Sequence, residues 1–194
     1  MLWSDVNRMT VNSRLYDIPK GFNANDIAIV FTISPFTINE YVRPAALPKS
    51  SKFQISNGGK TMVSGFGRTQ DRSMRKPYVA EKFKYTQISI RPPTYCQNLT
   101  DGFDGKRFLC GIGKEENQFA HRDACTNDSG GPLIAKVLNE KQEEKFTLVG
   151  IVSYGDGVGK SKPTRDVFKH CGSYGVYTKV SQYLNFIHDP VHNY

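Results

Sequence analysis

The apolar residues of this chain fall in short runs that are separated by turn-forming residues. The run from Asn23 to Ser34 is rich in Ile, Val, Phe and Thr and is bounded by Asn, Asp and Pro, which predicts a strand. Comparable β-type runs lie at Phe83–Ile90, Arg107–Gly113, Leu133–Leu138, Phe146–Tyr154 and Gly175–Val180. Short strands without helix-length periodic segments between them indicate an all-β sandwich or barrel rather than a parallel sheet.

Three smaller patterns complete the expected elements. The sequences KFQIS and KTMVSGFG flank Asn57-Gly58-Gly59, which predicts two short strands joined by a tight turn. The charged residues 139–145 predict the tip of another hairpin. Only Ser181–His188 has a helical pattern, with apolar residues on one face and Ser181 as its N-cap.

A change in composition near the first quarter of the chain suggests a boundary. Pro44, Pro48 and the small residues between them are typical of a linker. We therefore expect one part at residues 1–48 and a second at residues 49–194.

Composition and charge narrow the class of protein. The 194 residues can bury the core of one domain or of two small ones, and 38% apolar with 12% aromatic residues is typical of a globular chain. There is no apolar run long enough to cross a membrane, so we expect no membrane partner. The net charge is +8, but the basic residues are spread along the chain, which favours a solvated surface over a nucleic-acid partner.

The cysteines indicate an oxidising compartment. An even number of cysteines fits two disulfides, with three pairings open, and their spacing does not suit a metal site. The four are Cys96, Cys110, Cys125 and Cys171. The opening MLWSDVNRMT has no basic leader, apolar core or cleavage site of a signal peptide, so either the start of the protein is missing or the protein is not exported.

The stretch Asp123–Leu133, DACTNDSGGPL, carries the candidate chemistry. Ser129 is followed by two glycines and a proline, which suits an exposed hydroxyl on a tight turn that a ligand can approach closely. An α/β-hydrolase would place such a serine in GxSxG between a strand and a helix, followed by an acid and a histidine. Asp166 and His188 could complete that order, but Asn127 replaces the first glycine and the βαβ pattern is missing.

Together with VGIVSYG (Val149–Gly155) and GVYTKVSQYL (Gly175–Leu184), this stretch closely resembles the chymotrypsin and trypsin family of serine peptidases. The resemblance begins at about Val11 and covers nearly the whole chain. It implies two antiparallel β-barrels, the first only partly present and the second complete, closed by a C-terminal helix. It also implies a secreted protein and the disulfides Cys96–Cys110 and Cys125–Cys171.

The resemblance assigns catalytic roles to residues of this chain. It implies that Ser129 is the nucleophile, that Asp26 orients the general base, and that Ser153 supports Asp26. The backbone amides of Asn127 and Ser129 would form the oxyanion hole. The family normally has glycine at position 127, but asparagine also tolerates a positive φ, so the turn can survive.

The resemblance also implies specificity for basic residues. Asp123 matches the acid at the base of the primary pocket, where a carboxylate favours Arg and Lys, and Gly155 and Gly175 match the glycines that keep its walls open. The segment 156–170 is much longer than in trypsins, and its basic residues would lie near the pocket mouth. No cofactor or metal is expected. The expected partners are protein or peptide substrates with Arg or Lys, and the assignment also allows a protease inhibitor.

The catalytic histidine is the main departure from the family pattern. In the family the order is His, Asp, Ser, but each of the four histidines here follows Asp26, and the TAAHC-like segment is absent. The activation sequence that would supply an N-terminal ammonium for Asp128 is absent too, so Asp128 should turn to solvent or find another donor. We therefore expect an N-terminally truncated and inactive serine endopeptidase.

Three explanations of this departure remain open: a peptidase whose first half-barrel is lost from the sequence, a non-catalytic homologue that binds or regulates a partner, or a splice product with little stable structure.

A separate motif, Asn98-Leu99-Thr100, matches the N-glycosylation pattern and is expected in a loop near Cys96. Asn127-Asp128-Ser129 matches it as well, but a glycan there would block the proposed site.

Overall fold

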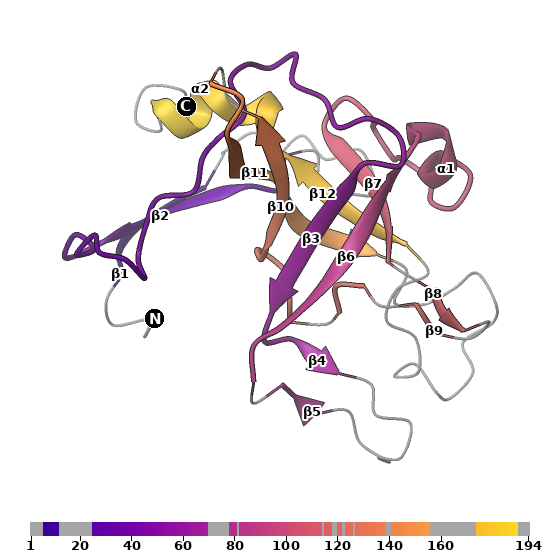
Figure 1. Ribbon diagram of the computed structural model, residues 1–194, viewed down its shortest axis with the longest axis horizontal. Coiled ribbons are helices and arrows are strands. Elements are labelled where there is room, and N and C mark those ends of the chain that lie inside the picture. The colour runs from indigo at the N-terminus through magenta and orange to yellow at the C-terminus, as the bar shows by residue number, and fades with distance from the viewer. Residues whose placement is uncertain are drawn as a thin grey trace.

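The computed structural model describes residues 6–11, 25–69, 78–80, 82–113, 115–117, 120–121, 123–125, 127–138, 141–155 and 174–189. Six of its strands form a closed barrel, in the order β3-β6-β7-β12-β11-β10, with β10 paired back to β3 and every pair antiparallel (Figure 1). These strands are β3 (Lys60–Gly65), β6 (Lys84–Arg91), β7 (Phe108–Gly113), β10 (Pro132–Leu138), β11 (Glu144–Gly155) and β12 (Gly175–Lys179). The expected all-β, trypsin-like fold is confirmed.

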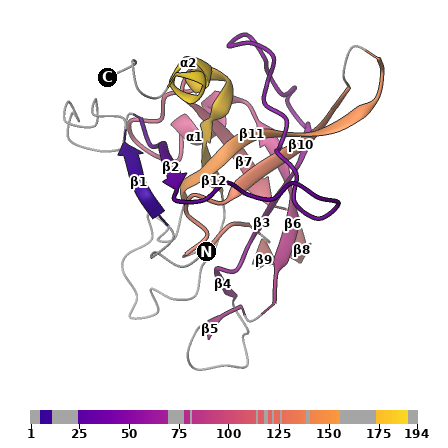
Figure 2. The ribbon, with the colours of Figure 1, turned by 90° about the vertical axis from the view of Figure 1, so that its left-hand side faces the viewer.

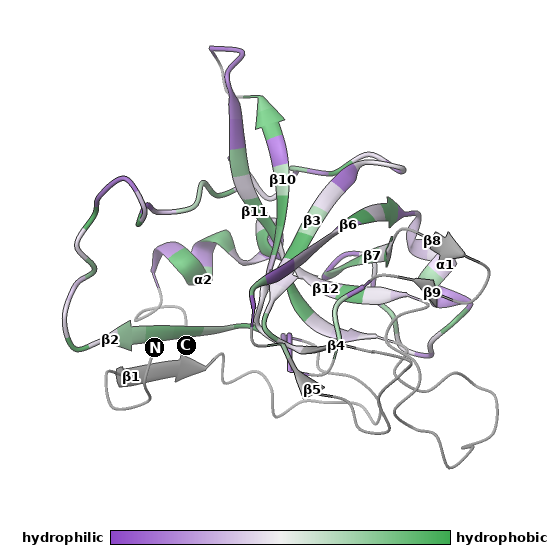
Figure 3. Ribbon diagram, turned by 60° about the horizontal axis from the view of Figure 1, so that its bottom comes forward, coloured by the Kyte–Doolittle hydropathy of each residue, from purple (hydrophilic) through white to green (hydrophobic). Residues whose placement is uncertain are grey.

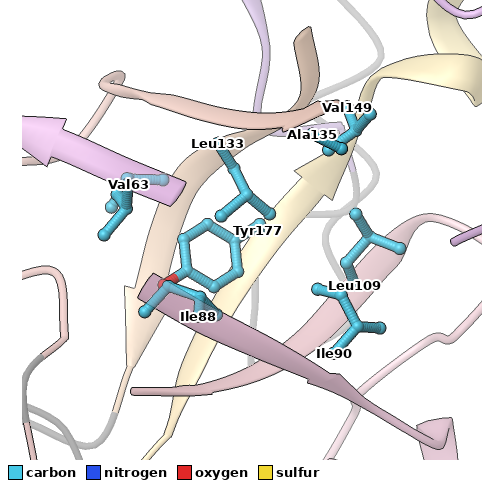
Figure 4. Close-up of a cluster of buried hydrophobic side chains, with 9 residues drawn as sticks. Val63, Ile88, Ile90, Leu109, Leu133, Ala135, Val149 and Tyr177 are labelled. Carbon is cyan, nitrogen blue, oxygen red and sulfur yellow. The ribbon is translucent and has the colours of Figure 1, made fainter. Parts of the chain in front are cut away.

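The barrel closes around a core to which all six strands contribute. Alternate residues of a strand point to opposite faces, so the inward positions of β3, β6 and β10 supply side chains such as Val63, Ile88 and Leu133. Tyr177 of β12 lies among them and is fully buried (Figure 4). The core cluster comprises Val63, Ile88, Ile90, Leu109, Leu133, Ala135, Val149, Val152 and Tyr177.

The described N-terminal part is a two-stranded antiparallel sheet beside the barrel, formed by β1 (Val6–Val11) and β2 (Ala28–Thr32) (Figures 1 and 2). The chain enters β2 through Ile27, which is buried against Tyr183 and Phe186. Those two residues belong to the C-terminal helices η3 (Val180–Tyr183) and α2 (Leu184–His188). The C-terminal helical segment therefore fixes the start of β2 on the barrel.

The remaining elements are short. Two hairpins, β4 (Arg68–Thr69) with β5 (Tyr78–Val79) and β8 (Glu115–Asn117) with β9 (Ala120–His121), extend from one end of the barrel (Figure 1). The helix α1 (Pro93–Gln97) was not expected, because five residues are too few for an apolar period. The Cys96–Cys110 disulfide joins it to β7, as the resemblance implied.

Two local expectations were wrong. Residues 52–56 form no strand, since the turn at Gly58 and Gly59 bonds to the end of β6 instead: the Gly58 amide donates to Ile90 O at 2.8 Å and the Ile90 amide to Gly59 O at 3.0 Å. Ser181 is not an N-cap, because the helical segment begins as a 3-10 turn at Val180 and buries Ser181.

The other expected hairpin forms between β10 and β11. Leu138 pairs with Glu144, and Lys136 makes an ion pair of 2.7 Å with Glu144 on the outer part of the hairpin, which projects from the barrel (Figure 2). The linker also lies on this hairpin, since the Leu148 amide donates to Ala46 O at 2.8 Å. The boundary at residue 48 stays a prediction.

Candidate active site

Ser129 lies on a tight turn between Cys125 and β10. Asn127 has a φ of 74° and Gly130 a φ of 81°, so two residues that flank the Asp128-Ser129 pair adopt the left-handed conformation. The turn is closed by backbone bonds from Asp128 N to Cys125 O at 3.0 Å and from Gly131 N to Asp128 O at 2.8 Å. Ser129 is exposed at its tip. As expected, asparagine at position 127 permits the positive φ.

The same turn is attached to β11. The Gly130 amide donates to Val152 O at 2.9 Å, and the Val152 amide donates to Gly131 O at 2.9 Å. The next residue of β11, Ser153, donates its hydroxyl hydrogen bond to Asp26 Oδ2 at 2.6 Å. Two successive residues of one strand therefore hold the Ser129 turn and the Asp26 carboxylate.

Asp26 is held by its backbone as well as by its side chain. Thr178 of β12, which is fully buried, donates from Oγ1 to the Asp26 carbonyl at 2.7 Å. Tyr183 donates from its hydroxyl to Asn25 Oδ1 at 3.1 Å, and burial raises the pKa of Tyr183 to about 12. Sequence reasoning did not assign roles to Thr178 or Tyr183, although both lie within the GVYTKVSQYL motif.

The carboxylate of Asp128 is bound by two backbone amides. Gly67 N donates to Oδ1 at 2.7 Å and Cys125 N donates to Oδ2 at 2.9 Å. A Cβ at Gly65 or at Gly67 would overlap this carboxylate, so a side chain at either position would displace it. Of the two expected alternatives, Asp128 therefore takes the second: it finds other donors.

The carboxylate of Asp123 accepts hydrogen bonds from Tyr177 of β12 and from the amide of the next residue in the chain. Its Oδ1 accepts from Tyr177 Oη at 2.6 Å and from the Ala124 amide at 2.7 Å, and its Oδ2 is buried. Burial, followed by the negative charge of Asp123, raises the pKa of Tyr177 well above its usual value. Tyr177 therefore keeps its proton at neutral pH and remains a donor to Asp123.

The two expected pocket glycines lie directly opposite each other. Gly155 of β11 pairs with Gly175 of β12. A Cβ at Gly175 would come 2.7 Å from the Tyr177 hydroxyl, and a Cβ at Gly155 would come 2.7 Å from Tyr174 O. A side chain at Gly175 would displace the Tyr177 hydroxyl that donates to Asp123, and one at Gly155 would displace the backbone at Tyr174.

Several expected features lie partly outside the described residues. Cys125 is disulfide-bonded, but Cys171, its expected partner, is outside them, as is the whole segment 156–170. His188 is exposed on α2 and His121 lies on β9, whereas the other two histidines are outside the described residues. Within the described part of the chain, we find neither a His, Cys, Asp or Glu cluster that could hold a metal nor a helix that could span a membrane.

Comparison with known proteins assigns the family. The family model described as trypsin matches residues 4–187. The chain belongs to the trypsin family. It is 29% identical to vitamin K-dependent protein C of Oryctolagus cuniculus over 175 residues, which are 86% of this chain and 33% of that protein.

Two other relatives give a similar result. Complement C1s subcomponent of Rattus norvegicus is 32% identical over 170 residues, covering 84% of this chain and 22% of the relative. Transmembrane protease serine 7 of Homo sapiens is 31% identical over 195 residues, covering 97% of this chain and 20% of the relative. This trypsin-family chain thus spans a third or less of the length of these relatives.

Proposed function

We propose that this chain is part of a serine endopeptidase that cleaves after arginine or lysine. In this proposal Ser129 is the nucleophile, Asp26 orients the base, and Asp123 selects the basic side chain. The observation that carries it is the 2.6 Å hydrogen bond from Ser153 to Asp26. Ser153 follows the residue that binds the Ser129 turn, so the bond supports a common site for nucleophile and acid.

The proposed chemistry needs a base that accepts the proton of Ser129. A serine hydroxyl is a poor nucleophile until a general base removes its proton, and in this family that base is an imidazole that a carboxylate holds in the right tautomer. Asp26 is suited to this task because Ser153 and Thr178 hold both its carboxylate and its backbone. The amides of Asn127 and Ser129 would then stabilise the oxyanion.

The proposed specificity depends on the environment of Asp123. Tyr177 and the Ala124 amide both donate to Oδ1, which fixes the orientation of the carboxylate. A carboxylate held in this way would bind a guanidinium or ammonium group through charge-assisted hydrogen bonds. Gly155 and Gly175 would leave room for the substrate side chain beside it.

We further propose that the polypeptide with this sequence does not turn over substrate by itself. All four histidines follow Asp26 in the sequence, whereas the family order places the catalytic histidine before the acid. His188, on the exposed face of α2, is not a candidate for the base. The alternative is a non-catalytic homologue that binds or regulates a partner. The position of all four histidines after Asp26 favours this alternative as well.

Binding of p-aminobenzamidine, an aryl amidine that fluoresces on transfer to an apolar site, tests the specificity site without requiring turnover. We expect saturable binding that Asp123→Asn weakens at least about tenfold, since a hydrogen bond to a charged group contributes about 1.5–3 kcal/mol. Asp101→Asn, at an exposed acid outside the site, is the matched control and should leave binding unchanged. Equal binding by all three proteins would exclude Asp123 as the specificity residue.

A second measurement tests the proposed inactivity. We expect neither fluorophosphonate labelling of Ser129 nor hydrolysis of an arginine amide above the level of Ser129→Ala. Hydrolysis that Ser129→Ala abolishes would contradict the proposed inactivity and establish the nucleophile. Ser56→Ala, an exposed serine outside the site, is the control for this substitution.

Location and partners remain part of the proposal. Cys110 and Cys125 are both disulfide-bonded, and disulfides favour a secreted or extracellular protein. Its partners would be proteins or peptides with exposed Arg or Lys, and a protease inhibitor would occupy the same site as a substrate.

A further inference from the structure

The Asn98-Leu99-Thr100 motif occupies the C-terminal end of α1. Asn98 has helical backbone angles (φ −76°, ψ −19°), and its amide donates to Thr94 O at 3.2 Å. Asn98 therefore continues the geometry of α1 by one residue. Its side chain is exposed, which is the condition that a glycan on a folded protein has to meet.

The backbone around the motif is firmly held. The amides of Leu99 and Thr100 both donate to Cys96 O, at 3.0 and 2.9 Å. Cys96 is itself fully buried and is disulfide-bonded to Cys110 of β7. Thr100 is buried, so the chain turns inward immediately after Asn98 and leaves that residue on the outside.

An exposed aromatic side chain lies on the same side of α1. Tyr95 precedes Asn98 by three residues, and residues three apart in a helical segment are neighbours on its surface. Tyr95 is 40% exposed and Leu99 is 37% exposed, so apolar surface flanks Asn98 in the chain. The C–H face of a pyranose ring can cover an aromatic ring and remove both surfaces from water.

We propose that Asn98 carries an N-linked glycan and that its first sugar packs on Tyr95. The glycan comes from a dolichyl-diphosphate oligosaccharide: the Asn98 amide nitrogen forms a bond to the anomeric carbon, the bond from that carbon to the diphosphate breaks, and the amide loses one proton. This inference rests on the proposed passage through the secretory pathway.

The second match to the pattern has different surroundings. Asn127 is held at a φ of 74° beside Ser129, and the central residue Asp128 bonds to the Gly67 and Cys125 amides. A glycan at Asn127 would cover the proposed nucleophile. Asn98 is therefore the site that the fold and the proposed function both accommodate.

The modification is tested on the full chain expressed behind a cleavable leader in a eukaryotic cell. Treatment of the secreted protein with peptide N-glycosidase should lower its mass, and peptide mapping should place the lost glycan at Asn98. Asn98→Gln should abolish the mass change, whereas Thr100→Ser, which keeps the pattern, and Gln97→Ala should retain it. Secreted wild-type protein without glycan at Asn98 would overturn the proposal.

This result is separable from the proposed function. Amidine binding that depends on Asp123, found in secreted protein that is unmodified at Asn98, would refute the glycan and leave the peptidase proposal intact. A glycan found at Asn127 would instead contradict the assignment of Ser129 as an accessible nucleophile.

The contact with Tyr95 is tested by thermal unfolding before and after enzymatic deglycosylation. We expect deglycosylation to lower the Tm of the wild type, and Tyr95→Ala to remove most of that difference. Tyr85→Ala, at a 70% exposed tyrosine on β6, is the matched control and should keep the full Tm difference between the glycosylated and the deglycosylated protein. An equal loss in wild type and Tyr95→Ala would refute packing on Tyr95.

Discussion

The six-stranded barrel and the segment that precedes it differ in how they place their apolar side chains. Each barrel strand directs side chains into one shared core, where Leu133, Ile88 and Tyr177 have no exposed surface. The chain after β2 carries apolar residues too (Figure 3), but they lie in solvent: Phe36 is 58% exposed and Ile38 is 60% exposed. Burial of apolar area therefore stabilises the barrel far more than this segment.

The difference shows which part of the molecule positions Asp26. Although Asp26 belongs to the N-terminal segment in sequence, the residues that bind it come from the barrel: Ser153 from β11 and Thr178 from β12. Ile27 is likewise buried against Tyr183 and Phe186 of the C-terminal helical segment. Thus the barrel and its helices hold the start of β2.

The largest expected effect is on the barrel core. Leu133→Ala should lower the free energy of unfolding by about 2–5 kcal/mol, because it removes buried methyl groups and leaves a cavity beside Tyr177. Leu138→Ala makes the same change on the same strand, but at a side chain that is 54% exposed, and should cost less than about 0.5 kcal/mol. Chemical denaturation measures both. Similar losses of unfolding free energy in Leu133→Ala and Leu138→Ala would show that burial does not decide how much each leucine contributes to stability.

An intermediate effect is expected at the junction between the two regions. The pKa of Tyr183 is raised from 10.0 to about 12, so the folded state holds this proton more tightly than the unfolded chain. Its contribution to stability is therefore complete below pH 10 and is lost as the pH rises through about 12. The loss is at most about 3 kcal/mol, since the pKa rises by about two units and one unit corresponds to about 1.4 kcal/mol.

Urea unfolding at a series of pH values between about 9 and 12 measures this loss. Tyr183→Phe should reduce the alkaline slope by about one proton, because the titrating hydroxyl is absent. Other tyrosines whose pKa is raised by burial, such as the partly buried Tyr154 with a pKa of about 12, keep part of the slope. Tyr41→Phe, at a tyrosine that is 87% exposed, should leave the slope unchanged. An unchanged slope in Tyr183→Phe would show that Tyr183 does not link its proton to folding.

The same contrast explains what could be predicted from the sequence. Barrel strands such as β6, β10 and β12 were predictable because each is a short run of β-forming residues bounded by turn-forming residues. The contacts of Asp26 were not, because Ser153 and Thr178 are 127 and 152 residues away in sequence and no local pattern encodes that distance. Ser153 was named only through the family resemblance.

Local patterns also failed where long-range pairing competed with them. The glycines after Asn57 fit a hairpin turn, but Gly58 and Gly59 instead bond to Ile90 at the end of β6. The two amides that donate to the Asp128 carboxylate could not be identified from the sequence either, since they are backbone groups of Gly67 and Cys125 and leave no side-chain signal. In the sequence, the contact is reflected only in Gly65 and Gly67, where a Cβ would overlap the Asp128 carboxylate.

The smallest effect on stability, and the sharpest test of the comparison, is expected from two phenylalanines of equal exposure. Phe36 in the N-terminal segment and Phe146 on β11 are both 58% exposed, so changing either to serine should alter the free energy of unfolding by less than about 0.5 kcal/mol. Their surroundings differ. Lys136 Nζ lies 5.7 Å from the centre of the Phe146 ring, whereas Phe36 lies between Ile33 and Ile38, which are 61% and 60% exposed.

Apolar side chains that are exposed together bind apolar dyes and promote association more than a ring beside a lysine does. Phe36→Ser should therefore lower the binding of anilinonaphthalene sulfonate and the sedimentation-detected self-association of the chain, whereas Phe146→Ser should change both much less. Equal decreases in the two variants would mean that the N-terminal segment is no more exposed to association than the barrel surface. A larger decrease in Phe36→Ser, at unchanged stability, would locate the unsatisfied apolar surface in the segment that follows Asp26, outside the elements that hold the candidate site.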